Sequence, residues 1–270
     1  MIYLRSALFN LAFYLNLIIQ MIIFSIPYFL MPRKAAWAIP KFWVRTNHWL
    51  LAMIAGTTHT VEGLENIPEG GYIIAPKHQS FWDAYGLLPY LDDPFYILKR
   101  ELTWIPLFGW YVVKMRMVPI NRGSREKVMP AVLEQTKRQM ADGRQLIIYP
   151  EGTRRPVGAE PAYRYGIARL YSELGVPVMP VAVVAGLFWP RRRFLRYPGN
   201  IRVRFLAPIE QGLPPEEFMQ RLISATEAAV DELLVDAVRE NPHLPLPEQA
   251  RRRYEELEQR AETVTAEAGP

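Results

Sequence analysis

The chain has 270 residues, half of them hydrophobic, which is enough for one large α/β domain with additional segments. It has no cysteine, so a disulfide framework, a thiol nucleophile and a cysteine-based metal site are excluded. The net charge is +5 and arginine outnumbers lysine, which suits a phosphate-bearing ligand or an anionic membrane face, or reflects a GC-rich genome. No nucleic-acid recognition motif accompanies the charge, so no nucleic acid is expected as a partner.

A long uncharged stretch lies between Arg5 and Arg33, with an apolar core from Ala7 to Leu30. A helix of about 20 apolar residues spans the hydrocarbon core of a bilayer, whereas the apolar region of a signal peptide usually has about 7–15. We therefore predict a membrane-anchoring helix, which Pro27 should kink or end. More basic residues follow the stretch than precede it, so the positive-inside rule predicts that the body of the protein is cytoplasmic.

The segment from Trp37 to Ile54 places aromatic residues among basic ones. This composition is typical of a helix at the membrane interface, although an ordinary core helix would also have it. The two segments fit either a single span or a two-helix hairpin that enters one leaflet. We assign residues 1–56 to a membrane-anchoring helical segment, and the compact chain with its arginine excess indicates a bacterial inner membrane.

The body, residues 57–240, alternates short apolar runs with helical patterns and begins with a short strand near Val61. Several runs are almost continuously apolar, as expected for strands that are covered on both faces. The alternation predicts a layered α/β domain with a largely parallel central sheet flanked by helices. The later strands are expected at Tyr72–Ala75, Phe95–Leu98, Arg116–Ile120, Gln145–Tyr149, Val178–Val184 and Ile201–Leu206, with helices at Arg125–Ala141 and Tyr163–Leu174.

The C-terminal part begins with a predicted helix from Pro214 to Arg239, because prolines followed by glutamates suit a helix N-terminus. A proline-rich stretch around His243 then interrupts the chain. Residues 241–270 are assigned to a charged tail, either a solvated helix or a disordered segment, with no chemistry of its own.

The pattern His-x4-Asp, formed by His78 and Asp83, follows the predicted strand at Tyr72–Ala75 and precedes a predicted helix that opens at Ala84 to Leu88. A histidine titrates near neutral pH and is available as a general base. An aspartate can orient the imidazole and stabilise its protonated form. If the substrate provides its own hydroxyl, no side-chain nucleophile is needed, which is the logic of an acyltransferase.

Three further blocks combine a strand with a polar or proline-containing turn. In the first, Pro119-Ile120-Asn121-Arg122-Gly123, the guanidinium of Arg122 can bind a phosphate in a bidentate way. In the second, Tyr149-Pro150-Glu151-Gly152-Thr153-Arg154, the glycine permits a close approach of the backbone to a ligand. In the third, Val176-Pro177-Val178-Met179-Pro180, two prolines indicate an edge strand or a bend.

In this order and spacing, the four blocks resemble the glycerophospholipid acyltransferase family of the 1-acyl-sn-glycerol-3-phosphate acyltransferase (PlsC) type, from about residue 72 to 185. The resemblance implies transfer of an acyl chain from acyl-CoA or acyl-carrier protein to the sn-2 hydroxyl of lysophosphatidic acid, giving phosphatidic acid. It implies no cofactor, and we expect no metal. The implied catalytic residues are His78 and Asp83, and the implied substrate-binding residues are Lys77, Arg122, Glu151, Gly152, Thr153 and Arg154.

The chain departs from the family pattern at two positions. Lys77 stands where the family often has asparagine, and Asn121 stands where it often has aspartate, so the acceptor is less defined than the reaction. Alternatives are another acceptor, such as a lyso-aminolipid or lysophosphatidylglycerol, or a catalytically silent, membrane-anchored lipid-binding protein. A hydrolase using Ser80 is a further alternative, but no Gly-x-Ser-x-Gly motif surrounds that serine.

The segment from Arg191 to Tyr197 interleaves basic and aromatic residues. This pattern suits an anionic membrane surface or an acidic acyl-carrier protein, and a solvated loop would have it as well.

Overall fold

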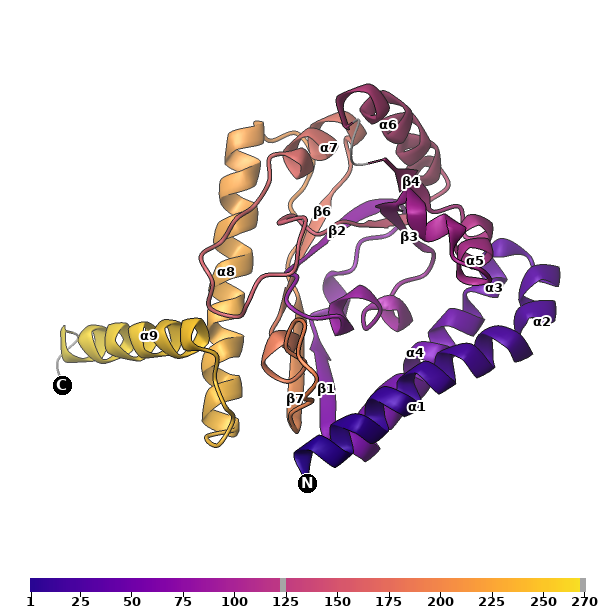
Figure 1. The fold of residues 1–270 in the computed structure, drawn as a ribbon. Coiled ribbons are helices and arrows are strands. Elements are labelled where there is room, and N and C mark those ends of the chain that lie inside the picture. Colours follow the sequence, from indigo (N-terminus) through magenta and orange to yellow (C-terminus); the bar gives the residue numbers. More distant parts are fainter. Residues whose placement is uncertain (122–124, 268–270) are drawn as a thin grey trace.

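The computed structural model describes residues 1–121 and 125–267, and a seven-stranded sheet forms its centre (Figure 1). The strand order is β1-β7-β6-β2-β5-β3-β4, and every neighbouring pair is parallel except β6 and β7. The predicted α/β fold with a largely parallel sheet is therefore confirmed. The strands are β1 Thr57–Glu62, β2 Tyr72–Pro76, β3 Pro94–Lys99, β4 Val118–Ile120, β5 Gln145–Ile147, β6 Val178–Val183 and β7 Gly199–Phe205.

Helices flank both sides of this sheet (Figure 1). Successive side chains of a strand point to opposite faces, so Ile73 of β2 packs in one apolar core and Ile74 in another. The core around Ile73 includes side chains of α6, α7 and the first part of α8, whereas the core around Ile74 includes side chains of α1 and α4. The helices are α1 Ile2–Ile23, α2 Ser25–Leu30, α3 Arg33–Ala36, α4 Ala38–Leu50, α5 Phe108–Lys114, α6 Arg125–Ala141, α7 Gly166–Leu174, α8 Pro215–Glu240 and α9 Glu248–Glu267.

The apolar N-terminal stretch forms two helices, because α1 ends at Ile23 and α2 begins at Ser25. The ring of a proline inside a helix clashes with the carbonyl four residues earlier, which for Pro27 is that of Ile23. The break therefore falls where the proline predicts it. Among the described residues, α1 is the one helix that is long and apolar enough to cross a membrane, by length and composition alone.

The α1 helix nevertheless lies along the body and makes polar contacts over its whole length. Arg5 Nε donates to the Ile54 carbonyl at 2.6 Å, and Ser6 Oγ accepts the Arg196 N–H at 2.9 Å. Towards the other end, Gln20 Nε2 donates to Thr46 Oγ1 of α4 at 2.9 Å. One side of α1 is therefore held by the protein along its full length.

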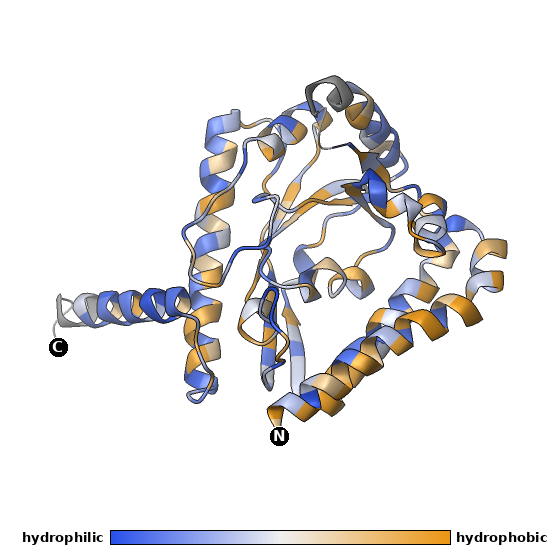
Figure 2. Cartoon of the chain, viewed as in Figure 1, coloured by the Kyte–Doolittle hydropathy of each residue, from blue (hydrophilic) through white to orange (hydrophobic). Residues whose placement is uncertain are grey.

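The opposite side of α1 is apolar and exposed (Figure 2). The α4 helix and the π-helical turn at Leu51–Ala55 continue this exposed apolar surface. Monomeric soluble proteins rarely expose contiguous apolar patches of such extent, so the surface marks a membrane or protein contact. Its members include Leu4, Leu8, Leu11, Leu15, Ile18, Ile22, Phe42, Trp49 and Met53.

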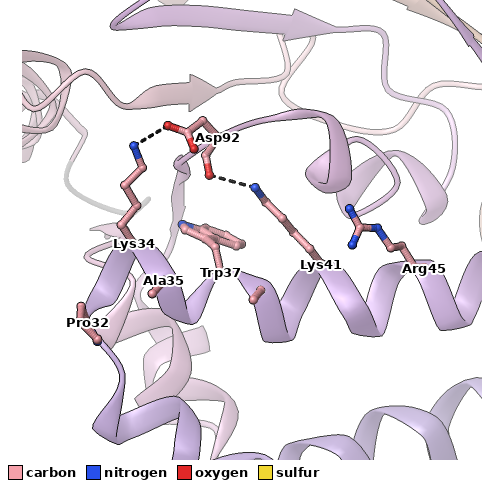
Figure 3. Close-up of a pocket in the computed structure, with 8 residues that line it drawn as sticks. Pro32, Lys34, Ala35, Trp37, Lys41, Arg45 and Asp92 are labelled. Carbon is pink, nitrogen blue, oxygen red and sulfur yellow. Dashed lines mark hydrogen bonds and ion pairs between the residues drawn. The ribbon is translucent and has the colours of Figure 1, made fainter.

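A basic groove of about 660 Å³ runs beside α3 and α4 (Figure 3). Lys34 pairs with the Asp92 carboxylate at 2.7 Å, and Lys41 donates to the Asp92 carbonyl at 3.0 Å. Arg45 lies one turn further along α4. The groove therefore presents three cationic side chains next to the exposed apolar surface of the same helix.

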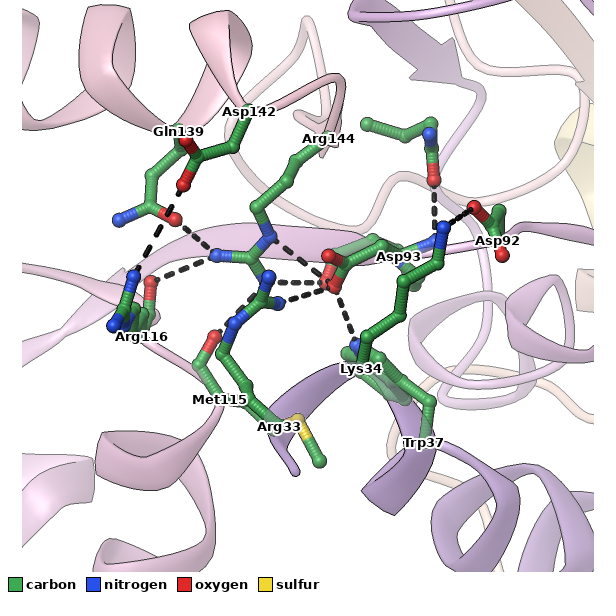
Figure 4. A network of polar contacts seen from close by, with 12 residues as sticks. Arg33, Lys34, Trp37, Asp92, Asp93, Met115, Arg116, Gln139, Asp142 and Arg144 are labelled. Carbon is green, nitrogen blue, oxygen red and sulfur yellow. Dashed lines mark hydrogen bonds and ion pairs between the residues drawn. The ribbon is translucent and has the colours of Figure 1, made fainter. Parts of the chain in front are cut away.

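A buried polar network connects the N-terminal helices to the sheet (Figure 4). One oxygen of Asp93 receives Arg33 at 2.6 Å, Trp37 Nε1 at 2.9 Å and Arg144 at 3.2 Å. Burial alone would raise the pKa of Asp93, but the hydrogen bond from Arg33 and the charges of both arginines hold it below its ordinary value. The N-terminal helices are thus attached to the sheet through a carboxylate that stays charged.

Two local expectations are corrected by the structure. The prolines of Val176–Pro180 predicted an edge strand or a bend, and the edge is wrong because β6 lies in the interior of the sheet. Pro180 is tolerated there because it lies between the bridge of Val178 with Ile209 and the first β6–β7 pair, and its carbonyl still accepts the Leu206 N–H.

The helix predicted to open at Ala84 is replaced by two 3₁₀ turns, Trp82–Ala84 and Leu88–Tyr90. Gly86 packs its backbone against the Trp82 ring, so close that a Cβ there would lie 2.6 Å from it. Pro89 lacks the N–H that an α-helix would need at that position.

Candidate active site

The His78 and Asp83 side chains meet just beyond the C-terminal end of β2. His78 Nδ1 lies 3.3 Å from Asp83 Oδ2, with the histidine side chain 14% exposed and the aspartate fully buried. The same oxygen accepts the N–H groups of Gln79 at 2.6 Å and Ser80 at 2.7 Å. These bonds to the charged carboxylate fix its position and leave Nε2 of the imidazole as the nitrogen that can act on a substrate.

Tyr149 forms a platform under the histidine ring. The two rings stack with centroids 3.8 Å apart and planes 19° from parallel. The tyrosine hydroxyl donates to the Asp83 carbonyl at 2.9 Å. Burial, with smaller contributions from the charges of Tyr96 and Asp83, raises the pKa of Tyr149 well above its ordinary value, so it stays neutral and keeps donating.

The turn after β5 contains the predicted Glu-Gly-Thr-Arg block and lies against the histidine segment. The Arg155 N–H donates to the His78 carbonyl at 2.8 Å, and the carbonyl of Arg154 accepts from Arg191. Gly152 has a φ of +66° in this turn, and Arg164 passes so close that a Cβ there would lie 3.2 Å from its Nε. Thr153 is exposed and Arg154 is half-buried, so both are accessible to a ligand.

Lys77 and Glu151 contact each other instead of facing solvent. Lys77 Nζ lies 3.2 Å from Glu151 Oε1 and 2.7 Å from Glu227 Oε1 of α8. The side chains of Lys77 and Glu151 are only 3% and 1% exposed. Their sequence-based assignment to substrate binding stays a prediction, and this geometry favours an indirect role for both.

The remaining predicted phosphate ligand, Arg122, lies outside the described residues. Its neighbour Asn121 follows β4 and is exposed. Strands β2, β5, β3 and β4 are all parallel, so the segments after β2, β4 and β5 emerge at the same edge of the sheet. The described parts of three of the four sequence blocks therefore lie at one edge of the sheet, as the carboxyl-edge rule for α/β sheets predicts.

Residues 58–184 match the family model described as Acyltransferase. Over this part, the chain is similar to the acyltransferase family. The chain is 37% identical over 161 residues to a 1-acyl-sn-glycerol-3-phosphate acyltransferase from Pseudomonas aeruginosa, covering 60% of this chain and 63% of that protein. It is also 26% identical to 1-acyl-sn-glycerol-3-phosphate acyltransferase alpha of Mus musculus, covering 56% of this chain and 54% of that protein. The match spans less than two thirds of the length of these curated relatives.

The crystal structure of the 1-acyl-sn-glycerophosphate (LPA) acyltransferase PlsC from Thermotoga maritima has a similar fold. The TM-score is 0.71 at 24% identity, and the match covers 86% of this chain and 99% of that one. The resemblance to the acyltransferase family seen in the sequence is thereby confirmed.

Ser80 is not placed as a nucleophile. Its side chain is fully buried and its hydroxyl donates to the Trp189 carbonyl at 2.8 Å. The same oxygen accepts the Trp82 N–H at 3.1 Å. The arrangement disfavours the alternative of a hydrolase that uses this serine.

Sequence reasoning missed three side chains near the site. Tyr149 belongs to a recognised block, but the sequence does not show its stacking on His78. Tyr163 and Glu227 bond to each other at 2.7 Å, and Glu227 follows Lys77 by 150 residues, so no local pattern links it to the site. No group of three or more His, Asp or Glu side chains in the described part of the chain is placed to hold a metal ion.

Proposed function

We propose that this protein transfers an acyl chain from an acyl thioester to the sn-2 hydroxyl of 1-acyl-sn-glycerol 3-phosphate, giving phosphatidic acid. The observation that carries the proposal is the His78–Asp83 pair, held at the sheet edge beside the Arg154 turn. The match of residues 58–184 to the acyltransferase family model and the similarity to two 1-acyl-sn-glycerol-3-phosphate acyltransferases support it.

In the proposed reaction, Nε2 of His78 removes the proton from the acceptor hydroxyl, and the Asp83 carboxylate stabilises the resulting imidazolium. The acceptor oxygen attacks the thioester carbonyl, the carbon–sulfur bond breaks, and the imidazolium returns the proton to the leaving thiolate. The N–H groups of Gln79 and Ser80 already bond to Asp83. The donors that stabilise the oxyanion are therefore other groups of the site.

The phosphate of the acceptor is proposed to bind at the Arg154 turn, together with Arg122. Arg154 is half-buried and its carbonyl is fixed by Arg191, so its guanidinium extends from a held backbone. Gly152 and Thr153 of the same turn are exposed residues. An arginine with a fixed backbone is well suited to a bidentate phosphate contact.

The N-terminal segment is proposed to lie on one leaflet instead of spanning the bilayer. The α1 helix bonds to the body from Arg5 to Gln20, so it cannot turn perpendicular to the membrane without breaking those contacts. Its exposed apolar side would enter the acyl region, while the groove with Lys34, Lys41 and Arg45 would meet anionic headgroups (Figure 3). Flotation with anionic vesicles tests this: Leu11→Glu should release the protein, and Glu255→Gln on α9 should not.

The proposed division of the chain is an anchoring segment at residues 1–56, an acyltransferase domain at 57–240 and a charged tail at 241–270. The proposed location is the cytoplasmic face of a bacterial inner membrane. The excess of basic residues after the N-terminal stretch supports this orientation.

The deciding experiment uses detergent-purified protein, with His78→Ala and the surface variant His243→Ala beside the wild type. Acyl-CoA and acyl-carrier protein are each offered with a panel of lysolipids, and mass spectrometry identifies the product. Phosphatidic acid from the wild type and His243→Ala, with turnover at least about 100-fold lower in His78→Ala, is expected. A product from another lysolipid would identify a different acceptor, and Asn121 would be the first residue to test as the cause. No product from any pair would favour a silent lipid-binding protein.

A further inference from the structure

A buried cluster of ion pairs involves Lys77, the residue that precedes His78. The single ammonium of Lys77 sits between two carboxylates, 2.7 Å from Glu227 and 3.2 Å from Glu151. Glu227 is 19% exposed, and its oxygen also accepts the hydroxyl of Tyr163 at 2.7 Å. Glu227 belongs to α8, outside the residues 58–184 that match the acyltransferase family.

Two members of this cluster, Lys77 and Glu151, belong to chain segments that form the active site. Lys77 is the residue before His78, and its N–H extends the β2–β6 pairing by donating to Val181 at 2.9 Å. Glu151 lies two residues after Tyr149, the ring on which His78 stacks. The Lys77–Glu151 contact thus joins the segment that holds the base to the segment that holds its platform, and Glu227 ties both to α8.

Stability alone does not explain such a cluster. Replacing a complete buried ion pair by neutral side chains of similar size is often neutral or stabilising, whereas removing one partner is strongly destabilising. The geometry that the ion pairs impose is the property that neutral side chains would not reproduce. A base displaced by about 1 Å can lose about 100-fold in rate.

We propose that Lys77 and Glu227 are positioning residues, which hold the rings of His78 and Tyr149 in the relative position that proton transfer requires. The inference rests on the proposed acyltransferase function. It assigns a positioning role to Glu227 of α8. It also assigns Lys77 to the positioning of His78 instead of to binding of the acceptor phosphate.

The test is the double variant Lys77→Met/Glu227→Gln in the full-length, detergent-purified protein. The double variant removes one positive and one negative charge, so the local net charge is conserved, and Arg155 still lies 3.9 Å from the Glu151 carboxylate. Glu151 keeps the Ala162 N–H at 3.3 Å, and Arg154 keeps its bond from Arg191, so the acceptor site is retained. We expect kcat to fall about 10- to 100-fold with an acceptor KM within about twofold of wild type.

Glu232→Gln is the matched control, because it makes the same change on α8 at a carboxylate that is 66% exposed and pairs with Arg204. Its kcat should equal that of the wild type. Wild-type kcat in the folded double variant would overturn the inference, and so would a raised acceptor KM with unchanged kcat. If the double variant does not fold, Glu227→Gln alone decides: it keeps the Tyr163 bond and the Lys77–Glu151 contact, and unchanged kcat there overturns the inference.

The wild type and His78→Ala are assayed in the same series. If the wild type forms no acylated product, the proposed function itself fails. If the wild type does so in a His78-dependent way and the cluster variants match its kcat, only the positioning role fails.

Discussion

His78 differs from the pair formed by His48 and His59 in the group that contacts its imidazole and in the exposure of its ring to solvent. His48 of α4 and His59 of β1 face each other with ring centroids 4.0 Å apart, and His59 bonds to the Tyr90 hydroxyl at 2.9 Å. No described group bonds to Nε2 of His48. His78 instead has the Asp83 carboxylate on one nitrogen and a partly exposed ring.

The His48–His59 pair has the properties of structural histidines, whereas His78 has those expected of the proposed base. Burial, followed by the charge of His59, lowers the pKa of His48 to about 3, and burial also lowers the pKa of His59. Both are therefore neutral packing residues that connect α4 to the sheet. Of these three described histidines, His78 alone has a carboxylate on a ring nitrogen, which in the proposed reaction would stabilise the proton taken from the acceptor.

The largest effect is expected from removing the charge of Asp83, the group that distinguishes His78 from the other two histidines. Asp83→Asn keeps a hydrogen-bond acceptor but removes the charge that stabilises the imidazolium, so kcat should fall about 100-fold or more. Steady-state acylation assays measure this, with Asp142→Asn on the surface as the control. Turnover within a few-fold of wild type would show that His78 works without its partner.

The second prediction concerns the structural pair. Because the pKa of His48 is lowered from 6.5 to about 3, the folded protein binds fewer protons than the unfolded chain between these values. The free energy of unfolding should therefore fall as the pH is lowered through this window, by about 2 kcal/mol from pH 7.5 to 5.

Thermal unfolding at the two pH values measures this loss. His48→Phe keeps the ring against Trp82, on which His48 stacks with centroids 5.3 Å apart, but cannot titrate. It should lose less stability in acid than the wild type, and His243→Gln should lose as much as the wild type. An equal loss in His48→Phe would contradict the assignment.

The third prediction separates acceptor binding from base catalysis. Arg154→Ala should raise the acceptor KM about 10-fold by removing a charged hydrogen-bond donor to phosphate, and should change kcat less. Arg169→Ala, an exposed arginine of α7, is the matched control. A normal KM for Arg154→Ala would remove it from the phosphate site.

The smallest expected effect concerns the platform beneath His78. Tyr149→Phe keeps the stacked ring and loses the hydrogen bond to the Asp83 carbonyl and the contact of its hydroxyl with Tyr96, so stability should fall by about 1 kcal/mol and kcat should stay within about threefold. Tyr96→Phe removes a similar bond, to the Ala84 carbonyl, and should behave alike. A much larger loss of turnover in Tyr149→Phe alone would give its hydroxyl a direct part in the reaction.

The strand positions were predictable because buried parallel strands are short, continuous apolar runs, as at Tyr72–Pro76 and Val178–Val183. Their order in the sheet was not. The prolines near Val178 indicated an edge or a bend, and the pairing of β6 with both β2 and β7 excludes the edge. A gap in the β7 ladder accommodates the missing N–H. The helix predicted after Asp83 does not form, because the packing of Gly86 against Trp82 prevails over the local helix propensity.

For the site, the sequence by itself determined the His78–Asp83 pair and the Arg154 turn, because five-residue spacing and a strand-to-turn boundary are local properties of the chain. Only the tertiary structure decided the surroundings of these residues. It turned Lys77 and Glu151 inward onto Glu227 of α8 and placed Tyr149 under the histidine. Ion pairs and ring stacks between distant segments leave no periodicity in a sequence, because they depend on which strands the fold brings side by side.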